Sequence, residues 1–499
     1  MEIYLTALAN VFSLNNVISM FIGTFFGIFM GAIPGISVNV AVTLMLPFTL
    51  VQQGITGILM ILGTYIGAVC GGAISSILLN VPGTPANAAT CIDGYAMAKR
   101  GEPGRALGIA MFASVFGGIF SALCLMFLAP PLSRVAIRFG SAEFFALTVF
   151  GLSIITGVSG KSVAKGIIGG LLGLLIATIG MDPMTSRLRF TFGSVYLLGG
   201  ISFVPALIGI YAFSQALVML EESYGKSGVT KIQKLTRVFP AWSDIKLILP
   251  TLFRSSTIGT FIGVVPGTGG DIAAFLSYNE AKRWSKHKDD FGKGAAEGIA
   301  APESASNGVT GGGMVPMLTL GIPGDGAIAI IMGAFLVQGL APGPLLFREH
   351  PSTVYSIFVG LIVANLIMCL LAYSSLRLFT QVLKIPVRIL TPLVIVLACI
   401  GAFCINNSYI DIFVMFFLGV IGFILIKMQF TMAPILLGMI LGRIAESNLR
   451  ITLLTARGDL TVFFTRPIAL AFLIAAALTL CSPLLKHAIK RLKESRRKA

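Results

Sequence analysis

The sequence has few charged residues. Asp, Glu, Lys and Arg together make up 11% of its 499 residues, whereas an ordinary soluble domain carries about 25%. Histidine is scarcer still, with three residues far apart in the chain, and the seven cysteines contain no C-x-x-C pair. These absences exclude a large soluble enzyme, a disulfide framework and a zinc-type metal centre. We therefore expect neither a metal site nor a bound cofactor.

The motifs of soluble nucleotide-binding enzymes are also absent. The sequence has no G-x-x-x-x-G-K-[ST] phosphate loop, and the stretch GTGGD does not fit G-x-G-x-x-G after a strand. No nucleophile elbow and no ATPase signature occurs, so we expect no catalytic residues and no enzyme activity. If the chain is a transporter, it must then run on an ion gradient, with Na⁺ or H⁺ as the coupling ion.

Long apolar runs fill most of the chain. Hydrophobic residues make up 56% of it, and runs near 20 residues recur, each long enough to cross a hydrocarbon core of about 30 Å. This pattern predicts an all-α polytopic membrane protein with about 10–12 transmembrane segments, whose main surroundings are the lipid bilayer. The runs are Val17–Ile33, Ile55–Leu79, Ala106–Leu128, Ser141–Val158, Val163–Ile179, Val195–Leu220, Ile245–Val265, Val354–Leu376, Val387–Ile405, Ile410–Ile426, Ala433–Ile444 and Ile468–Leu485.

The basic residues indicate an orientation. The formal net charge is +16, but the Lys and Arg residues lie between the apolar runs and in the tail 486–499, which does not indicate a nucleic-acid partner. Cytoplasmic loops carry an excess of Lys and Arg, so we expect this tail on the cytoplasmic side. No Lys or Arg precedes Lys99, so the N-terminus lacks the basic region of a cleaved signal peptide.

An internal repeat divides the chain into two halves. The stretch GAIPGISVNVAVT (31–43) matches GVVPGTGGDIAAF (263–275) at an offset of 232 residues, and Pro82-Gly83 matches Pro323-Gly324 at an offset of 241. Two such halves favour a pseudo-two-fold fold, predicted here as an inverted repeat, whose commonest use is secondary transport. We expect a first transmembrane repeat at 1–225, a polar linker at 226–244, a second repeat at 245–485 and the basic tail at 486–499.

The repeated Pro-Gly pairs are expected to interrupt helices inside the membrane, as broken or re-entrant segments. Pro removes a backbone donor and clashes with the preceding turn, and Gly adopts backbone angles that other residues avoid. Such irregular backbone is tolerated at membrane depth where protein or a water-filled cavity covers it. Half-helix N-termini attract carboxylates, and unwound carbonyls suit Na⁺. The predicted residues binding an organic anion substrate are Pro34, Gly35, Ser37, Asn39, Pro82, Gly83, Thr84, Pro266, Gly267, Thr268, Asn307, Pro323 and Gly324.

Cation ligands are expected among the carboxylates of the second half. Asp271 and Asp325 directly follow repeat motifs, and Glu303 lies in GAAEGIAAPESASNGVTGGGMVP (294–316). The small and polar residues of that stretch suit neither a lipid-facing helix nor a floppy linker. An intramembrane carboxylate is a functional candidate, and hard cations bind oxygen ligands. For Glu303 the alternative is an interfacial loop. Arg254, inside the run Ile245–Val265, could pair with a carboxylate of the substrate, and the alternatives are a structural ion pair or an interfacial position.

Two plainer explanations stay open. Glycines recur every four residues, as at Gly23, Gly27 and Gly31, and such ridges are typical of close helix packing. The Pro-Gly pairs would then be simple kinks. Packing does not account for the polar residues that follow Pro-Gly at matched positions of both halves, so we favour a binding site.

Three long stretches carry a resemblance to a known family. They are GAIPGISVNVAVTLMLPFT (31–49), LLNVPGTPANAATCIDGYAMAKRGEPGRALG (78–108), and the segment from GVVPGTGGDIAAFLSYNEAKR through GKGAAEGIAAPESASNG to LTLGIPGDGAIAIIMGAFLVQGLAPGPLLF. With them the chain strongly resembles the large membrane subunit of the tripartite tricarboxylate transporters. The resemblance implies a bacterial inner-membrane permease with two partners, a small membrane subunit and a periplasmic solute-binding protein. It also implies cation-driven uptake, typically with Na⁺, of citrate-like tricarboxylates or other organic anions.

A self-sufficient ion-coupled carboxylate permease is the alternative function. Uptake by the chain alone, without a binding protein, would favour it. A membrane-embedded enzyme or lipid-handling protein would need catalytic groups clustered at depth, and the few His residues and the lack of paired carboxylates argue against it.

Overall fold

The computed structural model describes residues 2–52, 54–153, 162–182, 184–223, 238–383, 385 and 387–480. Helices make up most of these residues, and the one sheet among them is the antiparallel pair of β1 (Gly180–Met181) and β2 (Leu188–Arg189). Eight of the described helices are long and apolar enough to cross a membrane. The predicted all-α polytopic fold is confirmed. The number of crossings stays a prediction, because five further apolar helices are only 10–17 residues long.

The chain forms two compact units, and each unit draws on both halves of the sequence. Unit 1 consists of Met1–Arg134 and Val204–Phe423, and unit 2 consists of Val135–Phe203 and Ile424–Ala499. The predicted repeats 1–225 and 245–485 are therefore sequence repeats and do not coincide with the compact units. Most of the predicted linker 226–244 and all of the tail 486–499 lie outside the described residues.

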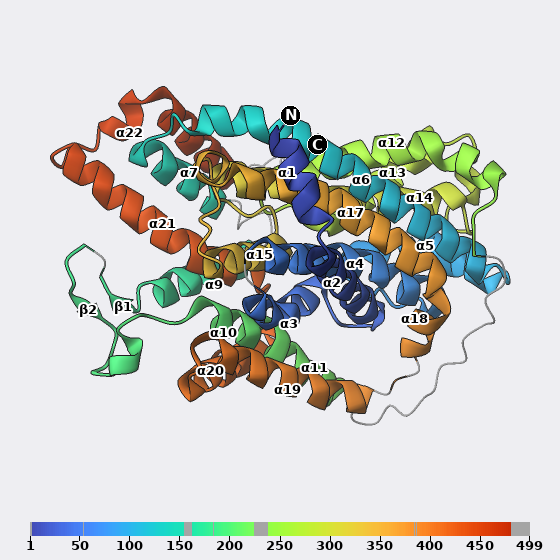
Figure 1. The fold of residues 1–499 in the computed structure, drawn as a ribbon, viewed down its shortest axis with the longest axis horizontal. Coiled ribbons are helices and arrows are strands. Elements are labelled where there is room, and N and C mark those ends of the chain that lie inside the picture. The colour runs from blue at the N-terminus through green and yellow to red at the C-terminus, as the bar shows by residue number, and fades with distance from the viewer. Residues whose placement is uncertain are drawn as a thin grey trace, which may run out of the picture. The chain divides into compact units, whose positions relative to one another are not determined.

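Unit 1 holds most of the helices (Figure 1). Its first-half elements are α1 (Glu2–Val11), α2 (Leu14–Ala32), α3 (Val38–Val51), α4 (Ile55–Leu79), the 3₁₀ turn η1 (Pro85–Asn87), α5 (Ala88–Lys99), α6 (Pro103–Ala136), α10 (Phe203–Leu207), the π-helix η3 (Ile208–Phe213) and α11 (Ser214–Ser223). Its second-half elements are α12 (Trp242–Val264), α13 (Gly269–Trp284), η4 (Lys288–Asp290), α14 (Ala296–Leu320), α15 (Gly326–Val337), α16 (Leu346–Glu349), α17 (Pro351–Ser374), α18 (Leu376–Val382), α19 (Val387–Asn406) and α20 (Tyr409–Lys427).

Unit 2 is smaller. Its elements are α7 (Ser141–Ser153), α9 (Val163–Ala177), the β1–β2 hairpin, η2 (Val195–Leu197), α21 (Ala433–Thr455), α22 (Val462–Thr465) and the helix Pro467–Leu480. Helix α21 packs against both α7 and α9. The predicted apolar run Val195–Leu220 is not one helix, since regular α-helix begins only at Phe203.

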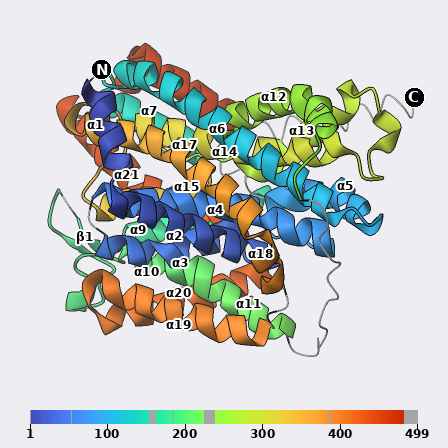
Figure 2. The same ribbon diagram turned by 45° about the vertical axis from the view of Figure 1, so that its right-hand side comes forward.

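Glycine seams bring the helices of unit 1 close together, which confirms the predicted packing ridges. Helix α2 packs on α4, and α12 packs on α14 (Figure 1 and Figure 2). A Cβ on Gly27 would overlap the carbonyl oxygen of Thr64, and a Cβ on Gly259 would overlap that of Ala305. Only glycine permits such an approach of two backbones. Helices α4 and α14 are buried along almost their whole length.

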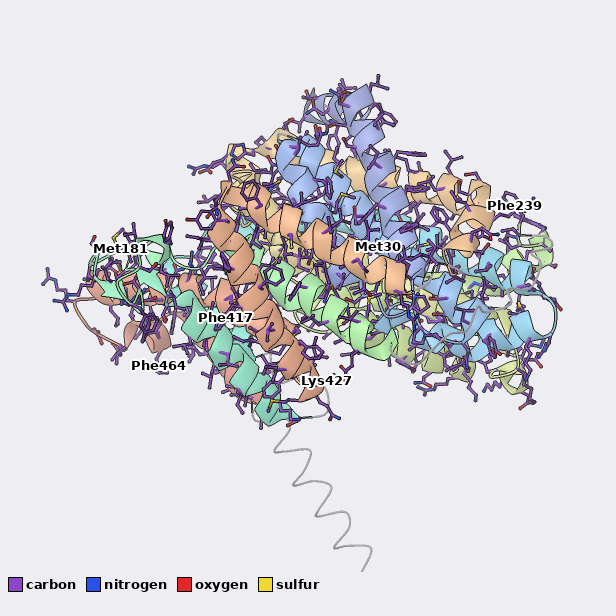
Figure 3. All side chains as sticks on the ribbon, turned by 90° about the horizontal axis from the view of Figure 1, so that it is seen from below. Met30, Met181, Phe239, Phe417, Lys427 and Phe464 are labelled. Atoms are coloured by element: carbon purple, nitrogen blue, oxygen red, sulfur yellow. The ribbon has the colours of Figure 1, made fainter. Side chains whose placement is uncertain are left out.

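Other helices of unit 1 present large apolar side chains outward. On α19 the exposed residues Ile389, Leu393, Val396 and Ile400 follow one another at helical spacing. Phe417 of α20, labelled in Figure 3, is 68% exposed. An apolar stripe of this kind suits a lipid environment, because water would penalise so much exposed hydrocarbon.

Candidate functional site

The first Pro-Gly pair of each half ends a helix in the same backbone conformation. Helix α2 ends at Ala32 and α12 ends at Val264, and the next residues, Ile33 and Val265, are extended. Gly35 then has a φ of +84° and its partner Gly267 a φ of +81°. Side chains other than glycine rarely adopt these angles, so the motif fixes the break through local backbone chemistry.

The second Pro-Gly pair of each half follows a buried helix. Helices α4 and α14 each have 25 residues and end in a left-handed residue, Asn80 with a φ of +57° and Gly321 with a φ of +72°. Left-handed residues commonly close a helix in this way. The four predicted helix breaks are therefore confirmed, and all four lie in unit 1.

The glycine of each second pair rests on the glycine seam of its own half. A Cβ on Gly83 would lie 2.5 Å from the Gly31 carbonyl oxygen and 2.6 Å from the Gly72 Cα. A Cβ on Gly324 would meet the matched atoms of the other half, the Gly313 Cα at 2.7 Å and the Gly263 oxygen at 3.0 Å. The two halves, which repeat each other in sequence, therefore also make matching glycine contacts.

The segments that follow the Pro-Gly pairs meet at two places, which we call the crossings. At each crossing, the segment after the first Pro-Gly pair of one half packs on the segment after the second Pro-Gly pair of the other half. Helix α3, which follows Pro34-Gly35, packs on α15, which follows Pro323-Gly324. Helix α13, which follows Pro266-Gly267, packs on η1, which follows Pro82-Gly83. A pseudo-two-fold relation between the halves predicts this exchange. The direction of the axis relative to the membrane, and with it the inverted repeat, stays a prediction.

The first crossing gathers polar groups that we call the Asp325 cluster, formed by Asp325, Asn39, Tyr65 and Tyr211. The Asp325 carboxylate caps α15 by accepting the Ile328 N–H at 2.8 Å, and its other oxygen accepts the Tyr65 hydroxyl at 3.2 Å. A Cβ on Gly326 would lie 3.0 Å from the Asn39 Nδ2 and 3.3 Å from the Tyr211 hydroxyl oxygen. The cluster is therefore built from both halves and from the π-helix η3.

The second crossing brings Asp271 to the loop after Pro82. A Cβ on Gly270 would lie 3.3 Å from the Ala86 Cβ and 3.7 Å from the Ser306 Cβ. Asp271 is exposed in the first turn of α13, whereas Asp325 caps α15 at the first crossing. The two predicted cation ligands thus lie at different crossings.

Glu303 is fully buried in α14, and no Lys or Arg of the described residues forms an ion pair with it. Its Oε1 accepts the Asn87 Nδ2 at 2.9 Å and the Thr90 hydroxyl at 2.6 Å, and its Oε2 accepts the Ser114 hydroxyl at 3.0 Å. The Thr84 hydroxyl in turn donates to Asn87. Glu303 therefore joins the second-half helix to the Pro82 loop, and it does not lie in an interfacial loop.

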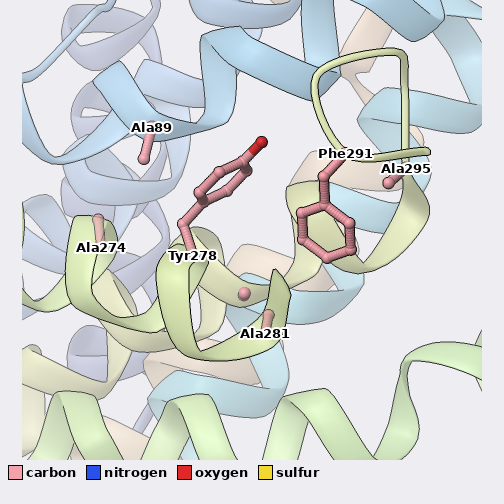
Figure 4. Packing of buried hydrophobic residues seen from close by; sticks show 7 residues of the cluster. Ala89, Ala274, Tyr278, Ala281, Phe291 and Ala295 are labelled. Carbon is pink, nitrogen blue, oxygen red and sulfur yellow. The ribbon is translucent and has the colours of Figure 1, made fainter. Parts of the chain in front are cut away.

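Asp93 anchors the start of α14, and its role is structural; Figure 4 shows the buried cluster around its partner Tyr278. Its Oδ1 accepts the backbone N–H groups of Gly292, Gly294 and Ala295, each at 2.8 Å. Its Oδ2 accepts the Tyr278 hydroxyl at 2.8 Å. The Tyr278 ring packs edge-on against Phe291 in the buried cluster around it. Asp93 thereby fastens first-half helix α5 to the α13–α14 connection of the second half.

Several predicted substrate residues already use their side chains within the fold. The Ser37 hydroxyl caps α3 through the Val40 N–H, and the Thr268 hydroxyl donates to carbonyls at the end of α12. Asn307 donates to the Glu303 carbonyl at 3.0 Å, while its side-chain oxygen has no partner. The predicted residues at or beside the two crossings are Pro34, Gly35, Ser37, Asn39, Pro82, Gly83, Thr84, Pro266, Gly267, Thr268, Asp271, Pro323, Gly324 and Asp325; Glu303 and Asn307 lie deeper, in α14.

Helix N-termini at the crossings differ in how they are capped. Helices α3 and α15 are capped by Ser37 and Asp325. Helix α13 has no side-chain cap, because Thr268 points its hydroxyl back to α12. The first N–H groups of α13 thus remain available, and such groups attract anions.

Sequence reasoning missed Tyr65 and Tyr211. Both lie inside apolar runs, where a tyrosine is ordinary, and neither run shows which face meets a Pro-Gly loop. Asn87 and Thr90 follow the Pro82 motif closely and could have been flagged as polar residues next to a break. Within the described residues, no group of three or more His, Cys, Asp or Glu could hold a metal ion.

Comparisons with known proteins agree on one family. The model described as Tripartite tricarboxylate transporter TctA family matches residues 17–437. An uncharacterised 52.8 kDa protein in the TAR-I ttuC' 3' region of Agrobacterium vitis is 38% identical over 459 residues, which cover 92% of this chain and 91% of that relative. An uncharacterised protein in the TAR-II ttuC' 3' region of Agrobacterium vitis is 40% identical over 215 residues, or 43% of this chain and 89% of that relative. No solved structure matches the chain.

Proposed function

Because the chain belongs to the tripartite tricarboxylate transporter TctA family, we propose that it is the large permease subunit of a binding-protein-dependent secondary transporter. In this proposal it imports tricarboxylates or related organic anions and is driven by a cation gradient. The family is one of membrane permeases, and the multi-pass helical fold agrees with it. The expected location is the bacterial inner membrane, with the C-terminus in the cytoplasm.

The observation that carries the proposal is the pair of crossings between broken helices. Each crossing joins the first break of one half to the second break of the other, and transporter sites typically lie where such discontinuous helices of two repeats meet. The crossings contain half-helix N-termini, backbone carbonyls and the carboxylates Asp271 and Asp325. They offer groups of both signs, as co-binding of an anion and a cation requires.

The substrate side of the site is proposed at the start of α13. The four Pro-Gly loops contain no Lys or Arg, so the carboxylates of the substrate must be held by peptide N–H groups, hydroxyls and bound cations. The uncapped N–H groups at Gly269 and Gly270, the start of α13, suit this role. Asp271 in the same turn would repel an anion, so we propose that a cation binds together with the substrate.

The partners in this proposal are a small membrane subunit and a periplasmic solute-binding protein. The experiment that tests it reconstitutes the chain with both into proteoliposomes and measures uptake of radiolabelled citrate and other di- and tricarboxylates. We expect uptake that needs the binding protein and an inward Na⁺ or H⁺ gradient. Uptake by the chain alone would favour the self-sufficient permease, and absence of uptake for every carboxylate would contradict the proposal.

A further inference from the structure

We infer that Asp325, Asn39 and Tyr211 form the binding site of a single monovalent cation such as Na⁺, with the Tyr211 hydroxyl as a direct ligand. This inference rests on the proposed function, because it assigns the coupling-ion site of the permease to the first crossing. Three observations support it: the Tyr211 hydroxyl without a partner among the described residues, the uncompensated charge of Asp325, and the oxygen ligands that the Asp325 cluster offers.

The Tyr211 hydroxyl is the first observation. The side chain is 6% exposed, and its hydroxyl has no hydrogen-bond partner among the described residues. A buried polar atom without a protein partner is rare, and an ordered water, a ligand or an ion is the usual explanation. The hydroxyl is directed at the start of α15, where it approaches Gly326 beside the Asn39 amide.

The π-helix accounts for the position of this hydroxyl. Residues Ile208–Phe213 form the π-turn η3, and all six are buried. π-Turns widen a helix locally and occur frequently at functional sites. In a regular α-helix, Tyr211 would point in a different direction. A cation site at the start of α15 would explain both the π-turn and the hydroxyl that it directs there.

The charge of Asp325 is the second observation. The described donors to its carboxylate are neutral, among them the Ile328 N–H and the Tyr65 hydroxyl. Among the described residues no Lys or Arg forms an ion pair with it. One monovalent cation would balance this single carboxylate, whereas a divalent ion would leave excess positive charge.

The ligand types agree with a hard cation. The cluster offers a carboxylate oxygen, the Asn39 amide oxygen and phenol oxygens, and it contains no sulfur or imidazole. Oxygen ligands of this kind suit Na⁺ and other hard cations. Asp325 and Asn39 are half-buried, so the protein does not completely enclose the site.

The experiment compares Tyr211→Phe with Tyr373→Phe in the purified full chain. Sodium chloride is titrated against choline chloride at constant ionic strength, and the thermal midpoint is followed by intrinsic fluorescence. Tyr373 is the matched control, because its hydroxyl donates to the Gly108 carbonyl at 2.9 Å, away from the cluster. We expect Na⁺ to raise the midpoint of the wild type and of Tyr373→Phe at the same concentrations. Tyr211→Phe should need about tenfold more Na⁺, the loss of one charge-assisted bond.

The Na⁺-free measurement separates a ligand from a structural hydroxyl. Tyr211→Phe removes a group that bonds to nothing in the fold, so its midpoint without Na⁺ should not fall, whereas that of Tyr373→Phe should. An unchanged Na⁺ titration in Tyr211→Phe, a lower Na⁺-free midpoint in that variant, or no Na⁺ effect on the wild type would each overturn the inference. The proposed function is judged separately, by uptake in the complete three-component system.

Discussion

Three carboxylates of unit 1 have different hydrogen-bond partners. The partners distinguish a carboxylate that stabilises the fold from one that can bind a ligand. Asp93 has all its acceptor positions filled by backbone N–H groups and Tyr278. Glu303 has three neutral side-chain donors. Asp325 accepts from neutral donors such as the Ile328 N–H and the Tyr65 hydroxyl, and it lies in one cluster with the Tyr211 hydroxyl, which has no partner among the described residues. The hydrogen-bond partners of Asp93 are all supplied by the fold, whereas Asp325 can accept a further ligand.

Replacement of Asp93 should therefore damage stability. Asp93→Ala leaves three backbone N–H groups and the Tyr278 hydroxyl without an acceptor, and each unsatisfied buried donor costs about 1–3 kcal/mol. We expect a loss of several kcal/mol, seen as a large fall in the thermal midpoint or in the yield of monodisperse protein. Asp93→Asn should be milder, because its amide oxygen can still accept the three N–H groups. The exposed Asp271→Asn is the control, and an Asp93→Ala protein as stable as that control would contradict the structural role.

Features that depend on local backbone chemistry could be predicted from the sequence, whereas side-chain roles that depend on distant contacts could not. The Pro-Gly breaks were predictable, because Pro34-Gly35 and its repeats fix the backbone locally. The ligand Tyr211 was not, because its role depends on contacts with α3 and α15, which lie far away in the chain. Glu303 was recognised as a candidate, but its partners Asn87, Thr90 and Ser114 lie 216, 213 and 189 residues away.

At the scale of elements, the matched glycines explain how a loop can lie against two helices. Gly83 sits over backbone atoms of α2 and α4 and beside the Ser75 hydroxyl, and Gly324 sits over backbone atoms of α12 and α14. Helix α14 was not recognised as a membrane helix from the sequence, because its small and polar residues lower its hydropathy. Its complete burial in protein removes the need for apolar side chains.

Alanine at the two matched glycines should have similar effects. Gly83→Ala and Gly324→Ala each place a methyl group 2.5–2.7 Å from backbone atoms, and overpacking of this kind costs about 1–3 kcal/mol. A Cβ on Gly35 would have nothing within 4 Å. Gly35→Ala should therefore lower the free energy of unfolding only through its left-handed backbone, by about 1–2 kcal/mol. Thermal midpoints of the three variants measure the difference. Equal midpoints for Gly83→Ala and the wild type would show that the loop does not rest on the seam.

The β1–β2 hairpin of unit 2 depends on one carboxylate outside the apolar helices. Asp182 accepts the Thr185 and Met184 N–H groups and pairs with Arg450 at 2.6 Å. These N–H groups, together with Arg450, hold the pKa of Asp182 well below its ordinary value of 3.8. A lowered pKa means that the charged form stabilises the hairpin at every pH above that ordinary value, and that this stabilisation is lost as the pH falls below it.

Asp182→Asn should therefore loosen the hairpin at neutral pH. We expect faster deuterium uptake over residues 180–200 at pH 7 than in the wild type, while the apolar helices of unit 2 keep their protection. In an acid series the two proteins should become alike well below pH 3.8. If uptake in the hairpin were the same at pH 7, the carboxylate would not hold the turn.

At the scale of the whole molecule, the duplication and the compact units divide the chain in different ways. Both crossings join the halves, and both lie within unit 1. The repeat was visible in the sequence because its motifs are local. The units were not visible, because they depend on which segments pack together after insertion into the membrane.

A disulfide across the second crossing would test this arrangement directly. In a variant without the native cysteines, Ala86→Cys and Gly270→Cys place their Cβ atoms about 3.3 Å apart, close to the 3.5–4.5 Å that a disulfide spans. With a protease site inserted between residues 224 and 237, oxidation should keep the two halves joined after cleavage on a denaturing gel. Gly35→Cys with Gly270→Cys is the control that also spans the cleavage site, and it should release the halves, because a Cβ on Gly35 has nothing within 4 Å. Failure of the first pair to link would contradict the exchange of broken helices.

The mixed origin of the units also has a consequence during synthesis of the protein. Asn87 leaves the ribosome 216 residues before its partner Glu303. At 5–20 residues per second, the wait is on the order of 10–40 s. During that time the amide, the hydroxyls of Thr90 and Ser114 and the open Pro82 loop have already been inserted without the groups that will satisfy them. The nascent N-terminal half is then a polar, incomplete membrane segment, and it must be held by the insertion machinery until the second half arrives.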